Sequence, residues 1–286
     1  MISFRFHIVS LAAVFMGLAL GIVLGTAFIN DATINRLETS IKRYRAERDD
    51  AQHNVGVWSK FADDAEASLV AGRLDGVRVF TIVPEGLSGS LTDKMHALLT
   101  TAGAVDAGRL TLANAWADDP APTDDIAKAL DIVGPSNIDS VTDAAAERLA
   151  REFAAGGGPT LPALVDANLA RLDAGDATTA PGLQARFLVI DDGAPAGLIE
   201  PLTRALAAQI PKSVLVADAS PDDTISQSMV VALRNKPESA LFSTVDHLDT
   251  VPGRLAAILA LRDFDRGATG DYGSGPGHDR AAPAPG

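Results

Sequence analysis

The sequence predicts an α/β fold in which an N-terminal transmembrane helix and a coiled-coil helix precede an α/β domain with a largely parallel sheet. Three observations lead to this prediction. Residues 1–30 contain a long apolar run, residues 31–72 show a seven-residue hydrophobic repeat, and residues 73–265 alternate short β-type runs with helical patterns. Strands that alternate with helices are typical of parallel sheets. Residues 266–286 are rich in Gly, Pro and Ala, and we expect this tail to be disordered.

The apolar run from Ile8 to Ile29 contains no charged side chain. As a helix that rises about 1.5 Å per residue it would span roughly 33 Å, close to the hydrocarbon thickness of a bilayer. We therefore predict a retained, single-pass anchor over residues 1–30. A cleavable signal peptide is the alternative, because Gly25, Thr26 and Ala27 are small, although the run is longer than the apolar core of such peptides.

The anchor also carries a face of small residues. Gly17, Gly21 and Gly25 recur at every fourth position, so they line one side of the helix and would let two backbones approach closely. We predict that anchors pair through this face; the alternative is that glycine is simply common in membrane helices. Basic residues follow the span but are interleaved with acidic ones, so charge decides neither the orientation nor the membrane.

A heptad repeat follows the anchor and predicts a coiled-coil stalk, with Ile34, Leu37, Ile41 and Tyr44 opening its seam. Arg48, at a core position, would weaken the seam. The alternative is one amphipathic helix that packs on its own domain. The core positions are, for a, Ile34, Ile41, Arg48, Val55, Ala62 and Leu69, and for d, Leu37, Tyr44, Ala51, Trp58 and Ala65.

In the α/β part, β-branched and apolar runs bounded by Gly, Pro and Asp mark strands, and longer 3.6-period runs mark helices. The predicted strands are Val77–Val83, Arg109–Leu112, Arg186–Ile190, Ser213–Ala217 and Ala240–Val245. The predicted helices are Ser90–Thr101, Asp124–Ile132, Thr142–Ala155, Leu161–Leu172, Leu198–Gln209, Thr224–Arg234 and Pro252–Phe264. A loop is expected at Asp118–Thr123.

Composition narrows the class of function. The chain contains no cysteine, which excludes disulfides, zinc–thiolate sites, iron–sulfur clusters and thiol nucleophiles. Its net charge of −13 repels nucleic acid, and no basic stripe is evident, so we expect no nucleic-acid partner. The Pro84–Gly89 turn lacks the dinucleotide fingerprint, the P-loop lysine and a full nucleophile elbow. We predict no catalytic residues, no tightly bound cofactor and no enzyme; an enzyme would need a polar pocket beside this turn or beside Asp191–Gly193.

The densest cluster of metal-ligating side chains lies at the end of the last predicted strand. Asp246, His247 and Asp249 are the candidate metal ligands there. The alternative is a hydrogen-bonded loop network that includes Thr244 and Arg254. The remaining histidines form no paired metal motif.

Both ends of the chain resemble the actinobacterial family named for mycobacterial copper transport protein B (the MctB family). The order of anchor, coiled coil, α/β domain and glycine-rich tail is also similar to that family, so the resemblance covers essentially the whole chain. The residues that carry the resemblance are Met1-Ile2-Ser3, Arg5, His7, Val9–Phe15, Gly21–Gly25, Ser243–Asp246, Asp249, Pro252–Arg254, Ile258–Leu261, Asp263, Tyr272, Gly273 and Gly275. The resemblance implies a role in copper efflux and resistance in the cell envelope, with a proposed pore at the outer membrane. An inner-membrane anchor agrees equally well with the residues.

Two functions therefore follow. The first is an envelope protein of this family that self-associates and contributes to copper efflux, with copper ion as the transported species. The second is a membrane-anchored coiled-coil scaffold that binds a partner and transports nothing. Copper(I) prefers thiolate and thioether ligands, and the chain offers no Cys and four Met. A weak imidazole–carboxylate site for copper(II) is what its residues allow.

Overall fold

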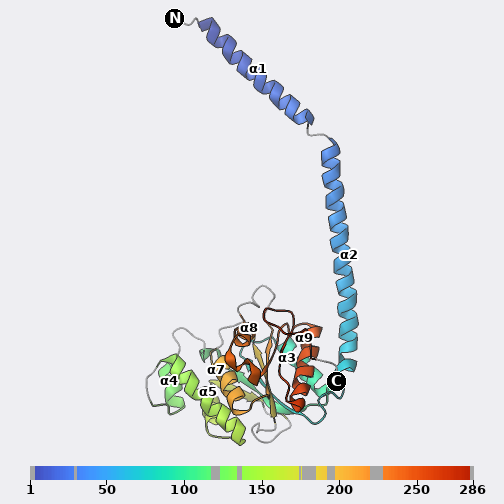
Figure 1. Ribbon diagram of the computed structural model, residues 1–286. Coiled ribbons are helices and arrows are strands. Elements are labelled where there is room, and N and C mark those ends of the chain that lie inside the picture. The colour runs from blue at the N-terminus through green and yellow to red at the C-terminus, as the bar shows by residue number, and fades with distance from the viewer. Residues whose placement is uncertain are drawn as a thin grey trace. The chain divides into compact units, whose positions relative to one another are not determined.

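The structure of the protein, shown in Figure 1, is a computed structural model. The chain divides into two compact units, residues 1–61 and 62–286. Some predicted features lie outside the described residues: the loop at 118–122, the pair Asp192–Gly193, the start of a helix at 224–227 and the side chain of Ile34. The structure describes residues 4–28, 31–116, 123–133, 137–173, 175, 185–191, 197–219 and 228–283.

The first unit is helical. Helix α1 spans Phe4–Phe28, and α2 begins at Asp31 and ends at Val70, so its last turns belong to the second unit. Within α1, Phe6–Gly25 has a mean hydropathy of 2.5 and none of it is buried in the protein. Among the described residues this is the one helix that is long and apolar enough to cross a bilayer, a property that signal sequences share.

The second unit is built on a seven-stranded sheet with the order β3-β2-β1-β4-β5-β6-β7. All neighbouring strands pair in parallel except β2 and β3, which are antiparallel. The prediction of a largely parallel sheet is thus confirmed. The strands are β1 Arg78–Pro84, β2 Val105–Leu112, β3 Ala170–Asp173, β4 Ala185–Asp191, β5 Val214–Asp218, β6 Ser243–Val245 and β7 Asp271–Tyr272.

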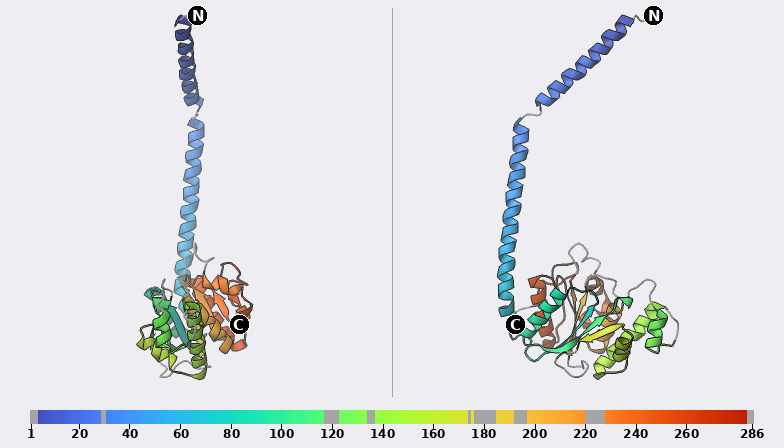
Figure 2. Two further views of the ribbon diagram at one scale, coloured as in Figure 1. Left: turned by 90° about the vertical axis from the view of Figure 1, so that its left-hand side faces the viewer. Right: turned by 180° about the vertical axis from the view of Figure 1, so that it is seen from behind.

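Helices cover both faces of the sheet, as in other doubly wound α/β proteins. Helices α3 and α9 pack on one face with the end of α2, and α4 to α8 pack on the other. Figures 1 and 2 show α5 and α7 side by side, apart from α3 and α9. The helices are α3 Gly89–Thr101, α4 Thr123–Ala129, α5 Ile138–Ala155, α6 Thr160–Asp166, α7 Ile199–Gln209, α8 Met229–Arg234 and α9 Val251–Asp263, with 3-10 turns η1 Asn114–Trp116, η3 Pro237–Leu241 and η4 Phe264–Arg266.

The central strands β1, β4 and β5 are largely buried on both faces, which explains why they read as nearly continuous apolar runs. Successive side chains of β1 alternate: Phe80 joins the core under α5, and Val79 joins the core under α9. Under α5 the core is aromatic, because the rings of Phe80, Phe153 and Phe187 lie with their centroids 5.4–5.9 Å apart. These aromatic contacts stabilise the packing of β1 and β4 against α5.

The helix predicted over Leu161–Leu172 is wrong in its second half. Helix α6 ends at Asp166, and Asn168 adopts a left-handed conformation with φ 56°. Asn tolerates this region better than most residues, so the chain reverses there. The next residues form β3, which pairs with β2 through Leu172 and Leu110. Long-range pairing thus overrides the helix propensity of the Ala-Arg-Leu segment.

The tail predicted to be disordered from residue 266 is instead part of the fold up to the last described residue, Pro283. Strand β7 extends the sheet beyond β6, with Thr244 opposite Asp271 and Val245 opposite Tyr272. Tyr272 is buried in the core beneath α9. The tail is ordered because the backbone of β7 pairs with β6 and because Tyr272 is buried in the core. Amino-acid composition does not reveal either interaction.

The end of α2 packs on the domain. Val70 is part of the core, and Glu66 is almost fully buried in an ion pair with Arg254 on α9. Ala62 and Ala65, two predicted seam positions, are half-buried in this unit. In these last turns the alternative of a helix packed on its own domain therefore holds.

Candidate functional site

The carboxyl ends of β1, β4, β5 and β6 meet at one edge of the sheet, where open α/β sheets bind ligands. Three neighbouring strands there finish on an aspartate: Asp191 ends β4, Asp218 ends β5 and Asp246 follows β6. All three are buried. Asp191 accepts a hydrogen bond of 3.1 Å from the backbone N–H of Met229, at the start of α8. Buried carboxylates are costly without such partners, and Asp191 and Asp246 both have them.

Asp246, a candidate metal ligand, is satisfied by protein groups. Its Oδ2 lies 2.8 Å from Nη1 of Arg234, and both side chains are excluded from solvent. The backbone N–H of Ser274 donates to Oδ1 at 2.8 Å and that of Gly275 to Oδ2 at 2.9 Å. Asp246 thereby holds the C-terminal tail against β6.

Arg234 completes this arrangement, which we call the tail latch: Arg234, Thr244, Asp246, Asp271 and the backbone of residues 272–276. Arg234 donates to the Thr244 hydroxyl at 2.8 Å, to the Tyr272 carbonyl at 2.6 Å and to the Pro276 carbonyl at 3.1 Å. The Thr244 hydroxyl donates to Asp271 at 2.6 Å. Burial raises the pKa of Asp271, while this hydrogen bond and Arg234 oppose the rise.

The tail approaches the carboxylate closely because of one glycine. Gly273 has φ 123°, and a Cβ placed on it would overlap the Asp246 carboxylate. Only glycine fits this position, for reasons of both conformation and space. The tail latch is therefore specified by Gly273 as much as by its charged pair.

The other two candidate ligands lie at the rim of the tail latch. His247 also has a left-handed backbone, and its Nε2 lies 3.8 Å from Oδ1 of Asp246, while Asp249 is exposed. Among the described residues, no group of three or more His, Asp or Glu side chains is arranged to hold a metal ion. Metal binding by Asp246, His247 and Asp249 stays a prediction.

The predicted loop network with Thr244 and Arg254 is present in part, and it includes a second arginine, Arg234, that was not expected. Thr244 contacts Arg234, whereas Arg254 forms a bidentate pair with Glu66 at 2.7 and 3.2 Å and donates to the Asp249 carbonyl at 2.6 Å. Sequence reasoning missed both Arg234 and Glu66. Each is a charged residue on an amphipathic helix, where charged residues are common. Its partner lies in another segment, so no local pattern indicated its role.

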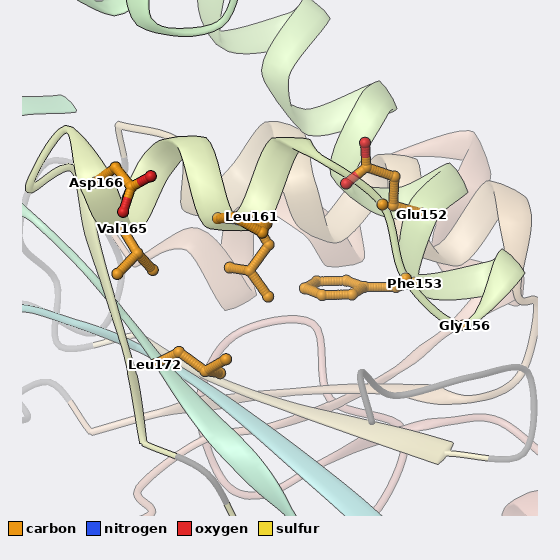
Figure 3. A pocket seen from close by; sticks show the side chains of 10 residues that line it. Glu152, Phe153, Gly156, Leu161, Val165, Asp166 and Leu172 are labelled. Carbon is orange, nitrogen blue, oxygen red and sulfur yellow. The ribbon is translucent and has the colours of Figure 1, made fainter. Parts of the chain in front are cut away.

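A second candidate site is an apolar pocket of about 520 Å³ beside the edge strand β3, which we call the β3 slot (Figure 3). The side chains of Phe153, Leu161 and Leu172 face one another across it. No sequence motif indicated this pocket. The β3 slot is lined by Glu152, Phe153, Gly156, Gly157, Gly158, Leu161, Pro162, Val165, Asp166 and Leu172.

The predicted oligomerisation residues lie in the first unit, and those described are exposed. Gly17, Gly21 and Gly25 have no atom near the position of a Cβ. On α2, the exposed side chains include Leu37, Ile41 and Tyr44. A helix that exposes apolar side chains at heptad spacing has an unfilled packing surface.

Comparison with known proteins identifies the family. A family model described as "Copper transport outer membrane protein, MctB" matches residues 1–283. The chain belongs to the MctB family. This confirms the resemblance, for which the two ends of the sequence are the most specific segments.

Named relatives of this MctB-family chain cover almost its full length. "Copper transporter MctB" of Mycobacterium leprae (strain TN) is 26% identical over 313 residues, which is 97% of this chain and 98% of the relative. The proteins of the same name from Mycobacterium bovis (strain ATCC BAA-935 / AF2122/97) and Mycobacterium tuberculosis (strain ATCC 25618 / H37Rv) are 27% identical over 311 residues, with the same coverage. These relatives are named as transporters, not enzymes.

Proposed function

We propose that this protein is an envelope-anchored member of the MctB family that contributes to copper efflux and resistance. The observation that carries the proposal is the family match over residues 1–283, together with the apolar helix α1 that precedes the domain. Copper ion is the transported species in this proposal. The transporter names of the relatives also support a role without catalysis.

Self-association is part of the proposal. A single apolar helix has no polar lumen, so a path for an ion would have to be assembled from several copies. The glycine face of α1 suits close packing in lipid, and the exposed Leu37, Ile41 and Tyr44 suit a parallel coiled coil. We propose that anchors and stalks together form the homo-oligomer.

Copper sensitivity of a deletion strain tests the function. Complementation uses the wild type, the seam variant Leu37→Asp with Ile41→Asp, and the rim variant His247→Asn with Asp249→Asn. The rim variant keeps Asp246, so it leaves the tail latch intact, and Asn tolerates the left-handed backbone of His247. We expect a copper-sensitive deletion strain that the wild type rescues and the seam variant does not.

The rim variant then separates two versions of the proposal. Failure to rescue would support copper handling at His247 and Asp249, whereas full rescue keeps the transport role and removes this site. Thr39→Asp with Ala46→Asp is the matched control for the seam, because it adds the same two negative charges on the outer face of the stalk. A deletion strain with normal copper tolerance would contradict the transport function altogether.

A membrane-anchored scaffold is the second candidate. It is favoured by the exposed apolar seam and by the fact that the part of the chain that the structure describes groups no three metal-ligating side chains. A scaffold predicts normal copper tolerance and altered envelope growth in the deletion strain, with the growth defect dependent on Leu37 and Ile41. The same strains therefore distinguish the two functions.

A further inference from the structure

The β3 slot lies beside a strand that has room for another partner. Strand β3 stands at the end of the strand order and pairs only with β2 among the described residues. A strand at the end of a sheet leaves a row of backbone N–H and C=O groups available on its outer side. Extended peptides bind to such edges by adding a strand, and neighbouring pockets accept alternate side chains.

The side chains next to this edge form a suitable pocket. Leu172 of β3 is 40% exposed, although Leu161 and Phe153 lie across from it (Figure 3). The volume of about 520 Å³ falls within the range of specific binding pockets, roughly 300–1,000 Å³. Gly156, Gly157 and Gly158 keep one wall free of side chains. An inserted apolar side chain would complete the contacts that Leu172 lacks.

The charges at the β3 slot indicate the chemistry of the partner. Its lining includes two carboxylates, Glu152 and Asp166, and none of the residues that line it is Lys or Arg. Both oxygens of Glu152 accept hydrogen bonds from Thr160, with distances of 2.6–3.1 Å to its N–H and hydroxyl, which hold Glu152 at the start of α6. Asp166 is exposed at the other end of α6. A cationic group placed beside an apolar one would match both features.

We propose that the β3 edge and the β3 slot bind an extended segment of a partner protein, in which an apolar side chain enters the slot and flanking Lys or Arg side chains approach Asp166 and Glu152. The net charge of −13 assists the approach of such a basic segment. None of the residues that line the slot belongs to the tail latch or to the stalk. The site would connect the α/β domain to another envelope protein.

The test uses the full chain in lipid nanodiscs, where detergent cannot fill the slot. Two end-blocked probe peptides are compared: one carries Lys two positions before and two positions after a central Leu, so that all three side chains lie on the same face of an added strand, and the other carries Glu in place of Lys. We expect the basic peptide to bind with a dissociation constant below about 1 mM and the acidic peptide to bind at least tenfold more weakly, about 1.4 kcal/mol. Hydrogen exchange should show new protection of the β3 amides when the basic peptide binds.

Matched variants separate the slot from general attraction to an acidic protein. Asp166→Lys and Leu172→Lys should each weaken the basic peptide about tenfold or more. Asp143→Lys makes the same charge change on α5, outside the slot, and should leave binding within about twofold. Each variant is accepted only if its unfolding curve matches that of the wild type.

Several outcomes would overturn the proposal. These are an equal loss of binding in Asp143→Lys, an affinity that is unchanged in Leu172→Lys, and binding without protection of β3. Displacement of the peptide by a neutral detergent, with no difference between basic and acidic peptides, would instead identify a site for an acyl chain. Failure of the basic peptide to bind at about 1 mM would also reject the site.

Discussion

At the scale of single residues, the structure explains why the C-terminal tail is folded although its composition is typical of disordered segments. Gly273 lets the backbone approach Asp246, and Tyr272 fills the adjacent core. Arg234 then neutralises the buried carboxylate and donates to the tail carbonyls. Removal of one member leaves another buried without a partner, which costs more than the contact itself contributes.

Gly273→Ala should release the tail. The added methyl group would overlap the Asp246 carboxylate, and alanine is strained at φ 123°. We expect a loss of unfolding free energy of about 2 kcal/mol or more, measured by denaturant titration, and faster exchange of the Asp246 and Tyr272 amides. Gly86→Ala is the control, since Gly86 also has positive φ but open space around it; an equal loss there would assign the effect to backbone strain alone.

Asp271 gives the tail latch a pH dependence of defined sign. Burial raises its pKa above the ordinary value of 3.8, so the folded protein holds this proton more tightly than the unfolded chain. Unfolding then releases a proton, and the free energy of unfolding falls as pH rises from 3.8 through the raised pKa. Asp271→Asn keeps an acceptor for Thr244 and should flatten this fall. The check is the unfolding free energy at several pH values above and below this window, and an unchanged slope in the variant would contradict the assignment.

At the scale of secondary-structure elements, α2 has two different environments along one helix. Its earlier apolar residues, such as Leu37 and Ile41, are exposed, whereas Val70 is in the domain core. Glu66 marks the change, because it reaches Arg254 on α9 and its neighbour Asp63 reaches Lys94 on α3. The seam predicted from the heptad pattern therefore does not continue unchanged into the last turns.

Removal of one partner of the Glu66–Arg254 ion pair should lower the free energy of unfolding strongly. Replacement of both partners by apolar residues should lower it much less. Glu66→Ala leaves a buried guanidinium without its carboxylate, and we expect a loss of about 3 kcal/mol in unfolding free energy. The double variant Glu66→Met with Arg254→Met should lose much less, because no charge is left buried. Asp63→Ala, on the exposed side of the same cluster, should cost less than about 1 kcal/mol. A double variant as unstable as the single one would show that the charges themselves are required.

At the scale of the whole molecule, the chain combines an apolar helix, an exposed heptad helix and an α/β domain, and the MctB-family match covers all of them. The domain has its own buried core on both faces of the sheet. Its stability should therefore not depend on the membrane. Function in the envelope, by contrast, should require the anchor.

Removal of residues 1–30 should release the protein into the aqueous fraction without changing the unfolding midpoint of the α/β domain. The physical reason is that Phe6–Gly25 is apolar and unburied, whereas the domain has its own buried core. Fractionation and denaturant titration measure the two effects. The intact mass of the full-length protein extracted from membranes is the companion measurement: we expect a mass that includes residues 1–30, and cleavage near Gly25–Ala27 would instead establish a signal peptide.

The sequence by itself determined the features that depend on local pattern. The apolar run, the alternation of strands and helices, the positions of β1, β4 and β5, and Pro252 in the first turn of α9 are all set by neighbouring residues. The family resemblance at both ends was readable for the same reason. Each of these signals lies within about twenty consecutive residues, where periodicity and turn residues are informative.

Only the tertiary structure decided the rest. That residues 170–173 form a strand depends on pairing with β2, and the order of the tail depends on β6, Arg234 and Asp246. The roles of Glu66 and Arg254 depend on a contact between residues 188 positions apart. In each case, two segments that are distant in the sequence form backbone hydrogen bonds with each other or neutralise each other's buried charges. The free energy of that pairing exceeds the local preference, and no local pattern records it.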